Sequence, residues 1–226
     1  MRVQHLELHD TIRLIDSRHD TEDDHALHAL THDDAEATAR LVDLVRITSG
    51  RAHAESGQNP VFDRNVLVAG VPMAAVINAA FAYPSGSGLG GGRFNRESIG
   101  AWYCSDELAT AQAEVGFHRS RFLQQSRIGQ AEMAFTSYLA DLNADFAVLG
   151  ARTDAEYLHA DSYVASQGFA DECRAGQLPA IRYPSVRAKS GRNAAVLVPH
   201  VVQHVRRARS FTVLWDGNEL QWSQIR

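Results

Sequence analysis

Residues 88–122 read GLGGGRFNRESIGAWYCSDELATAQAEVGFHRSRF, and our prediction of the fold starts from them. The stretch opens with glycines, which let the backbone adopt a positive φ or approach a ligand closely. A short buried strand is predicted over residues 101–104. Ser105 then offers an N-cap oxygen, and Asp106 and Glu107 fall in the first turn of a helix, where the helix dipole favours negative charge. The stretch therefore predicts a binding loop, a strand and a helix in direct succession.

The predicted helix carries an acidic residue at the edge of its apolar face. That face is formed by residues at three- and four-residue steps: Leu108, Ala111, Val115, His118 and Phe122. Glu114 lies beside this stripe, where an ionised carboxylate loses hydration unless a cation, a hydroxyl group or a ligand partners it. An ordinary helix pair with His118, four residues further on, is the alternative. Glu114 is thus the first candidate for a functional residue.

The composition limits the classes of protein to which the chain can belong. It has 226 residues, of which 45% are hydrophobic, enough to bury a core as one domain. The 22 lysines and arginines are outnumbered by 27 acidic residues, and a net charge of −5 argues against general nucleic-acid binding. Cys104 and Cys173 are expected as buried free thiols. The chain shows no signal peptide and no long apolar run, which predicts a cytoplasmic protein without a membrane segment.

The remaining segments alternate between short strands and helices. Strands are predicted around residues 11–15, 132–142, 179–183, 194–198, 211–215 and 220–225, and helices over residues 71–83 and 159–174. The third and fourth strands are expected to form one hairpin, and the last two another. This pattern predicts an α+β fold of mostly short strands. We expect a single domain over residues 1–226, with an insertion or extension at 18–90 and a C-terminal hairpin at 200–226.

A histidine-rich segment raises the question of a metal site. His25, His28 and His32 have helical spacing and could present three imidazoles on one side, and His200 and His204 could add to such a set. The alternative is a solvated acidic segment. Because the segment has neither cysteines nor an HExxH motif, no metal is expected.

Four blocks of sequence together resemble the RES-domain family. They are GGRFN at 91–95, GAWYCSDELATAQAEV at 100–115, SYVASQ at 162–167 and YPSVRAKSGRNAAVLVP at 183–199. The family is named for an arginine, a glutamate and a serine, and the matching positions are Arg93, Glu114 and Ser185. The predicted strand with Arg13 resembles the opening strand of the family. Four blocks in the same order are far more specific than any one of them.

The resemblance implies a fold and an activity. The fold would be ADP-ribosyltransferase-like, with a split, mostly antiparallel β core of short strands flanked by helices. The activity would be cleavage of NAD+ at the nicotinamide bond, with ADP-ribose passing to water or phosphate, or in some members to a protein. Members of the family act as toxins of bacterial toxin–antitoxin pairs, and the implied partner is a helix-turn-helix (Xre-type) antitoxin. NAD+ would then be the substrate, with no metal required.

The chemistry of this bond agrees with the residues at the matching positions. Loss of nicotinamide leaves positive charge on the ribose, which a carboxylate such as Glu114 can stabilise. The leaving group is a neutral pyridine, so that no second acid is needed to protonate it. The pyrophosphate needs cations, for which Arg93 is the first candidate and Arg13 the second.

Four further residues are candidates for substrate binding or catalysis, and three of them have a structural alternative. The ring of Tyr103 can cover nicotinamide or ribose, or be a core aromatic. Ser185 can bind a ribose hydroxyl or the nicotinamide amide, or be a turn serine. Arg187 can contact phosphate or be a solvated charge of the hairpin. Asn193 can orient the loop that carries Ser185.

Three functions remain open from the sequence. The first is an NAD+ glycohydrolase or phosphorylase, and the second is a protein mono-ADP-ribosyltransferase that uses the same site. The third is a non-catalytic module that binds a nucleotide or a partner protein, although such a module has no need to keep Arg93, Glu114 and Ser185 together. The oligomeric state, including a homo-oligomer, is left open as well.

Overall fold

The computed structural model describes residues 1–17, 34–37, 40, 66–82 and 91–225. The described strands form one seven-stranded sheet in the order β1-β2-β5-β4-β3-β6-β7, and β1 also pairs with β3. Only the β3–β4 pair is parallel among these strand pairs. The chain is therefore an α+β protein with a mostly antiparallel sheet, as predicted.

The elements of this fold have the following bounds. The strands are β1 Val3–Asp16, β2 Trp102–Ser105, β3 Ala131–Val148, β4 Ala180–Pro184, β5 Arg192–Val196, β6 Val202–Trp215 and β7 Leu220–Gln224. The α-helices are α4 Ala74–Ala82, α5 Leu108–Gln125 and α6 Val164–Ala175, and the 3-10 helices are η3 Ala155–Leu158 and η4 Pro199–Val201.

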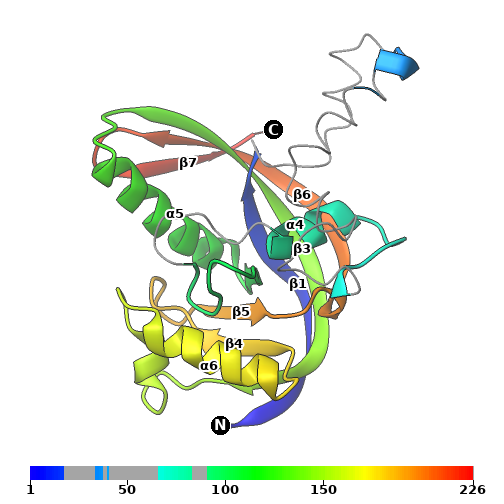
Figure 1. Ribbon diagram of the computed structural model, residues 1–226. Coiled ribbons are helices and arrows are strands. Elements are labelled where there is room, and N and C mark those ends of the chain that lie inside the picture. The colour runs from blue at the N-terminus through cyan, green and yellow to red at the C-terminus, as the bar shows by residue number, and fades with distance from the viewer. Residues whose placement is uncertain (18–33, 38–39, 41–65, 83–90, 226) are drawn as a thin grey trace.

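The sheet is split into a part with long strands and a part with short strands. β1, β3 and β6 pair along most of their length. The short strands β2, β5 and β4 lie crosswise to them (Figure 1), because β2 pairs with β1 only at Ile12 and Ser105 and β4 pairs with β3 only at its C-terminal end. The β1–β2 pair joins the two parts at one edge, and the β3–β4 pair joins them at the other. The two parts enclose a core, which α4 covers with Ile77 and Phe81.

Three strands are much longer than the sequence predicted. β1, β3 and β6 have 14, 18 and 14 residues. β-bulges interrupt their pairing, and in two of them Asp10 and His204 adopt a left-handed conformation with φ of 55° and 48°. A bulge shifts the alternation of inward and outward side chains, so that a period of two residues no longer marks one continuous strand.

The start of α5 also differs from the prediction. Ser105 belongs to β2, and α5 begins at Leu108 with Glu107 as its N-cap. Asp106 does not lie in the first turn, because it forms a two-point ion pair with Arg182 of β4, with 2.8 Å between Nη1 and Oδ1. A charge-assisted bidentate pair outweighs a weak preference for a helix terminus.

The predicted apolar face of α5 is confirmed in the first half of the helix and wrong in the second. Leu108, Ala111 and Val115 pack against β1, β3 and β6. His118 is exposed, and so is Phe122 with 52% of its surface accessible. Further along the helix Leu123 is buried instead, and the partly buried Arg119 pairs with the buried Asp16 at 2.9 Å.

Other expectations are met or lie outside the described residues. Cys104 and Cys173 are buried and free, and burial raises the pKa of each thiol to about 11. The β4–β5 and β6–β7 hairpins form as predicted. His25, His28 and His32 lie outside the described residues, as does most of the 18–90 segment. The division into one domain with an insertion stays a prediction.

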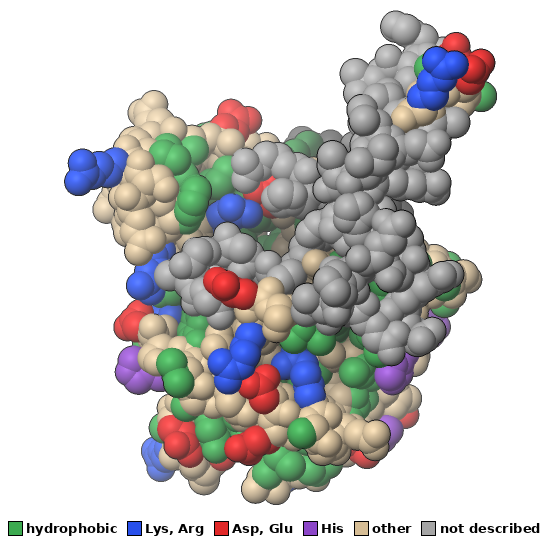
Figure 2. Space-filling view, in the orientation of Figure 1, with side chains coloured by type: hydrophobic (Ala, Val, Ile, Leu, Met, Phe, Trp, Pro, Cys, Tyr) green, Lys and Arg blue, Asp and Glu red, His purple; other side chains and the backbone are tan. Residues whose placement is uncertain are grey.

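The described residues contain no group of three or more His, Cys, Asp or Glu side chains arranged to hold a metal ion, and His204 instead lies 3.0 Å from Asp141. No helix among them combines the length and the apolar character needed to cross a bilayer. On the face shown in Figure 2, acidic and basic side chains of the described residues are interspersed.

Gly100 lies at the end of the loop before β2 and packs directly against α4. We expect this position to tolerate no side chain. Its N–H donates to the carbonyl of Phe81 at 2.9 Å, and an added Cβ would fall on the carbonyl of Ala80 and lie 2.8 Å from the Cα of Phe81. Gly100→Ala should lower the free energy of unfolding by about 1–3 kcal/mol in urea denaturation. Gly168→Ala is the matched control, since nothing lies within 4 Å of its Cβ, and alanine in α6 should raise stability by about 0.5–1 kcal/mol. Equal effects of the two changes would contradict this packing.

Candidate functional site

Glu114 on α5 is held by two side chains of the β4–β5 hairpin. Ser185 Oγ donates to Glu114 Oε1 at 2.6 Å, and Asn193 Nδ2 donates to the same oxygen at 2.7 Å. No described residue donates a hydrogen bond to Oε2. The alternative pair with His118 is not formed as a hydrogen bond. The structure thus brings together Glu114, Ser185 and Asn193, which lie far apart in the sequence.

The orientation of Asn193 is fixed from behind by β2. Asn193 is 2% exposed, and its Oδ1 accepts a hydrogen bond from Ser105 Oγ at 2.7 Å. Because the amide oxygen is used in this way, the amide nitrogen must point at Glu114. Ser105 was predicted as a helix cap, and its role at the site was missed. It depends on the register of β2 against β5, in which Ser105 lies opposite Asn193.

Ser185 is both a turn serine and a partner of Glu114. Its Oγ accepts hydrogen bonds from the backbone N–H groups of Arg187 and Ala188, at 3.0 and 2.9 Å. These bonds shape the loop after β4, and the remaining hydroxyl proton is directed at Glu114. The two interpretations offered by the sequence are therefore not exclusive, because a hydroxyl group can donate once and accept twice.

Arg93 is buried beside this group, with 7% of its surface exposed. Its Nη1 donates to the carbonyls of Tyr157 and His159, at 3.3 and 2.8 Å, and its guanidinium carbon lies 4.7 Å from the ring centroid of Tyr163. Its Nε and Nη2 donate to no described residue. One edge of the guanidinium is thus fixed, and the other edge keeps its donors.

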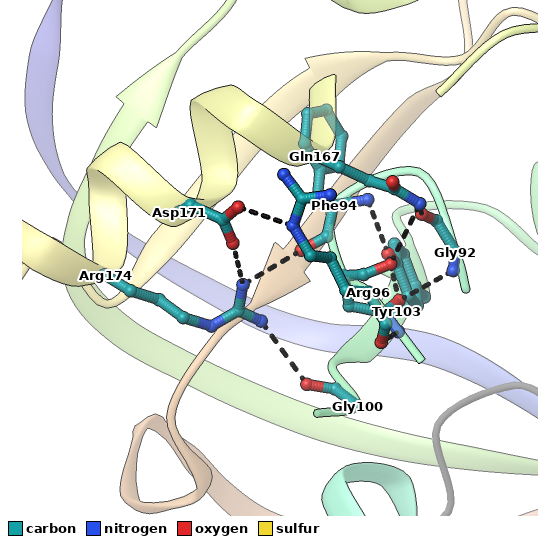
Figure 3. Close-up of polar contacts among 9 residues, drawn as sticks. Gly92, Phe94, Arg96, Gly100, Tyr103, Gln167, Asp171 and Arg174 are labelled. Carbon is teal, nitrogen blue, oxygen red and sulfur yellow. Dashed lines mark hydrogen bonds and ion pairs between the residues drawn. The ribbon is translucent and has the colours of Figure 1, made fainter. Parts of the chain in front are cut away.

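The loop that carries Arg93 is clamped by its neighbours. Figure 3 shows Tyr103, whose hydroxyl accepts from the N–H of Phe94 and donates to Asn95 Oδ1, both at 2.8 Å. Gln167 of α6 donates to the carbonyls of Gly92 and Asn95, at 3.0 and 3.2 Å. Burial raises the pKa of the Tyr103 hydroxyl well above its ordinary value, so that it stays a neutral donor.

The same clamp excludes side chains at the two glycines that precede Arg93. Gly91 has a φ of 99°, and a Cβ on Gly92 would lie 2.8 Å from the hydroxyl of Tyr103. The sequence predicted that these glycines serve a close backbone approach, and within the described residues the approach is to Asn95 and Tyr103. The position of Arg93 is therefore set by the backbone of its own loop.

Arg187 follows Ser185 in the loop after β4, and its backbone N–H donates to Ser185 Oγ. Its guanidinium carbon is 3.3 Å from the ring centroid of Phe117, its Nη2 donates to the carbonyl of Ala160, and its Nε is buried without a hydrogen-bond partner. Neither Arg187 nor Arg93 forms an ion pair with a carboxylate of the described residues. Glu114, Arg187 and Arg93 all act on the pKa of His118. Two guanidinium groups without a carboxylate partner among the described residues thus lie near one acid, which suits a ligand with more than one negative charge.

His118 connects the two arginines through a row of rings. Its centroid lies 5.4 Å from that of Phe117 and 6.5 Å from that of Tyr163. Although His118 is accessible at the surface, its ring lies beside Phe117 and Tyr163, and desolvation there lowers its pKa. Arg187 and Arg93 lower this pKa further, while Glu114 acts in the opposite direction. The imidazole is therefore neutral at neutral pH, and its protonation on acidification would be opposed by the surrounding arginines.

Arg13, the second candidate for a phosphate contact, lies apart from this group. It points to the opposite face of the sheet from Ile12 and Leu14, which pack under α5. There its guanidinium carbon lies 4.8 Å from the ring centroid of Trp102, and Nη1 donates to the carbonyl of Tyr103 at 3.2 Å. Burial lowers the pKa of Arg13 to about 10. Its alternation along β1 was visible in the sequence, but the side of the sheet that α5 covers was not.

The family model described as "RES domain" matches residues 68–216, well over half of the chain. Among solved structures, the crystal structure of the M. tuberculosis MbcT-MbcA toxin-antitoxin complex is similar, with a TM-score of 0.41 and 14% sequence identity. The similarity covers 55% of this chain and 74% of that chain. No curated protein sequence matches.

Removal of the Ser105 hydroxyl should destabilise the protein. Ser105→Ala leaves the amide oxygen of Asn193 buried without a donor, and we expect a loss of about 1–3 kcal/mol in the free energy of unfolding. Ser223→Ala is the control, because Ser223 lies in β7 with an exposed side chain, and it should change stability by less than about 0.5 kcal/mol. Urea denaturation measures both. A Ser105→Ala variant as stable as Ser223→Ala would show that the bond to Asn193 has no structural role.

Proposed function

Because the chain belongs to the RES-domain family, we propose that it degrades NAD+ by cleaving the bond between nicotinamide and ribose. The observation that carries this proposal is the geometry around Glu114. Its Oε1 is held by Ser185 and Asn193, and its Oε2 is not engaged by the described residues. Two arginines without carboxylate partners among the described residues lie near it, since both act with Glu114 on the pKa of His118. One acid and two cations suit a substrate whose ribose reacts next to a pyrophosphate.

Glu114 is the proposed catalytic residue. As the glycosidic bond breaks, positive charge develops on the ribose, and a carboxylate in a fixed position stabilises this charge without reorganising. Ser185 and Asn193 donate to one oxygen and so keep the carboxylate in a fixed orientation. The other oxygen then faces the ribose. Nicotinamide departs as a neutral molecule, so that no general acid is required.

Arg93 and Arg187 are the proposed ligands of the pyrophosphate. Arg93 keeps Nε and Nη2 as donors. These two N–H groups lie on one edge of the guanidinium and can donate parallel hydrogen bonds to two oxygens of a phosphate. Arg187 has a buried Nε without a partner, which a phosphate oxygen would satisfy. Arg13 is left out of this assignment because it lies on the opposite face of the sheet. Tyr103 acts mainly through its hydroxyl, which holds the loop of Arg93.

The acceptor of ADP-ribose distinguishes three versions of this function. Water gives a glycohydrolase, phosphate a phosphorylase and a side chain a protein mono-ADP-ribosyltransferase. We propose water or phosphate as the acceptor, with a protein side chain as the alternative. By analogy with its family, we also propose that the chain is the toxin of a toxin–antitoxin pair, with an Xre-type antitoxin as its partner.

Purified protein should consume NAD+ and release nicotinamide. Incubation with and without phosphate, followed by chromatography and mass spectrometry, identifies ADP-ribose, its 1-phosphate or modified protein as the product. Glu114→Gln should lower kcat about 100- to 1,000-fold, because it removes the charge that stabilises the transition state. Glu132→Gln, a change of an exposed carboxylate on β3, should keep full activity. Intact NAD+ under all conditions, or an active Glu114→Gln variant, would refute the proposal.

Expression of the wild-type chain in a bacterial host should arrest growth, because NAD+ loss stops metabolism. Glu114→Gln should abolish the arrest and Glu132→Gln should preserve it, with the amount of each protein measured by immunoblot. Optical density over time and cellular NAD+ content are the two readouts. Growth at the same rate for wild type and Glu114→Gln, with both expressed, would argue against a toxin while leaving NAD+ cleavage in vitro as a separate question.

A further inference from the structure

An open groove of about 490 Å³ lies beside α5, further along the helix than Glu114. Its lining is formed by four residues of α5 and one from the segment before α6: Phe117, Ser120, Arg121, Gln124 and Asp161. Its volume is within the range of small-molecule sites. None of the residues that the catalytic proposal uses lines the groove, so that the proposal leaves it without a role.

The groove is joined to the candidate site by Arg187. The guanidinium of Arg187 lies on the ring of Phe117 at the near end of the groove, and its Nη2 donates to the carbonyl of Ala160, next to the opposite wall. Its backbone N–H donates to Ser185 Oγ, which in turn donates to Glu114. One unpaired cation therefore stands between the acid and the groove.

The groove and the acid follow one side of the same helix. Glu114, Phe117, Arg121 and Gln124 succeed one another at steps of three, four and three residues, which places them in a row. At 1.5 Å per residue, the row is about 15 Å long. A ligand with a reacting group at Glu114 and an anionic centre at Arg187 would therefore continue into the groove.

The side chains of the groove can recognise a nucleoside. Gln124 can bind the donor–acceptor edge of adenine with its amide, in the way that glutamine pairs with adenine N6 and N7. Arg121 can stack its planar guanidinium on a base. Asp161 lies 3.6 Å from Arg121 across the groove and can accept hydrogen bonds from ribose hydroxyls, as acidic residues do in dinucleotide sites.

We propose that this groove binds the adenosine half of the dinucleotide whose nicotinamide half reacts at Glu114. The inference rests on the proposed function and adds the placement of the substrate. Ribose at Glu114, pyrophosphate at Arg93 and Arg187, and adenosine along Arg121 and Gln124 form one continuous path. An adenosine subsite gives binding energy away from the reacting bond, which an enzyme can use to hold that bond in place.

Nicotinamide mononucleotide tests this placement, because it has the same scissile bond and no adenosine. Wild-type protein should cleave NAD+ with a higher kcat/KM than the mononucleotide. Arg121→Ala and Gln124→Ala should each lower kcat/KM for NAD+ about tenfold and leave the mononucleotide unaffected. Gln125→Ala, at the next exposed position of α5, lies outside the groove and should change neither rate. The side chains of Arg121 and Asp161 are 37% and 66% exposed, so that loss of their ion pair should not unfold the protein.

Adenosine monophosphate provides a second readout. It should compete with NAD+ in the wild-type protein, and Arg121→Ala and Gln124→Ala should weaken this inhibition about tenfold. An equal fall in kcat/KM for NAD+ and the mononucleotide would show that the two side chains support the structure of α5 and do not contact adenosine. An unchanged kcat/KM for both compounds would assign the groove to another molecule such as an acceptor protein. Both results overturn the subsite and leave NAD+ cleavage standing. A wild-type protein that cleaves neither compound would instead refute the proposed function, and the subsite with it.

Discussion

The carboxylate of Glu114 is the constraint around which the candidate site is built. It is partly buried on α5, where it needs donors that its own helix does not supply. Those donors come from Ser185 and Asn193 on the β4–β5 hairpin, at 2.6 and 2.7 Å. Ser105 on β2 fixes Asn193 in turn. Helix, hairpin and strand must therefore be docked together before the acid is satisfied, which ties the site to the folding of the short-stranded part of the sheet.

The two arginines near Glu114 show how the fold keeps positive charge in place without neutralising it. Backbone carbonyls take up Nη1 of Arg93 and Nη2 of Arg187, and aromatic rings lie against both guanidinium groups. Carbonyl groups and aromatic rings stabilise a cation but carry no negative charge, so the full charge stays available to a ligand. The loop of Arg93 is held rigid by Tyr103 and Gln167, so that a ligand would meet donors already in position. This preorganisation lowers the entropy cost of binding.

The split sheet explains why Arg13 and Arg93 have different surroundings although both resembled phosphate ligands. β1 pairs with β2 at one position only, and α5 covers the face on which Ile12 and Leu14 lie. Arg13 therefore points to the face covered by α4 and stacks on Trp102. Arg93 comes from a loop that passes on the other side, under α6. A residue one step along a strand changes face, whereas a loop residue can be turned to where its backbone is anchored.

The sequence by itself determined the α+β class, the hairpins and the buried thiols, because these depend on periodicity and turn residues. Its resemblance to one family named Arg93, Glu114 and Ser185 as candidate site residues. Only the tertiary structure decided the long bulged strands, the start of α5 after the ion pair of Asp106, and the face of Arg13. It also supplied Ser105 as the support of Asn193 and the rings of Phe117 and Tyr163 beside the arginines. The physical reason is that these features depend on strand register and on contacts between distant segments, and neither leaves a period or a spacing in the chain.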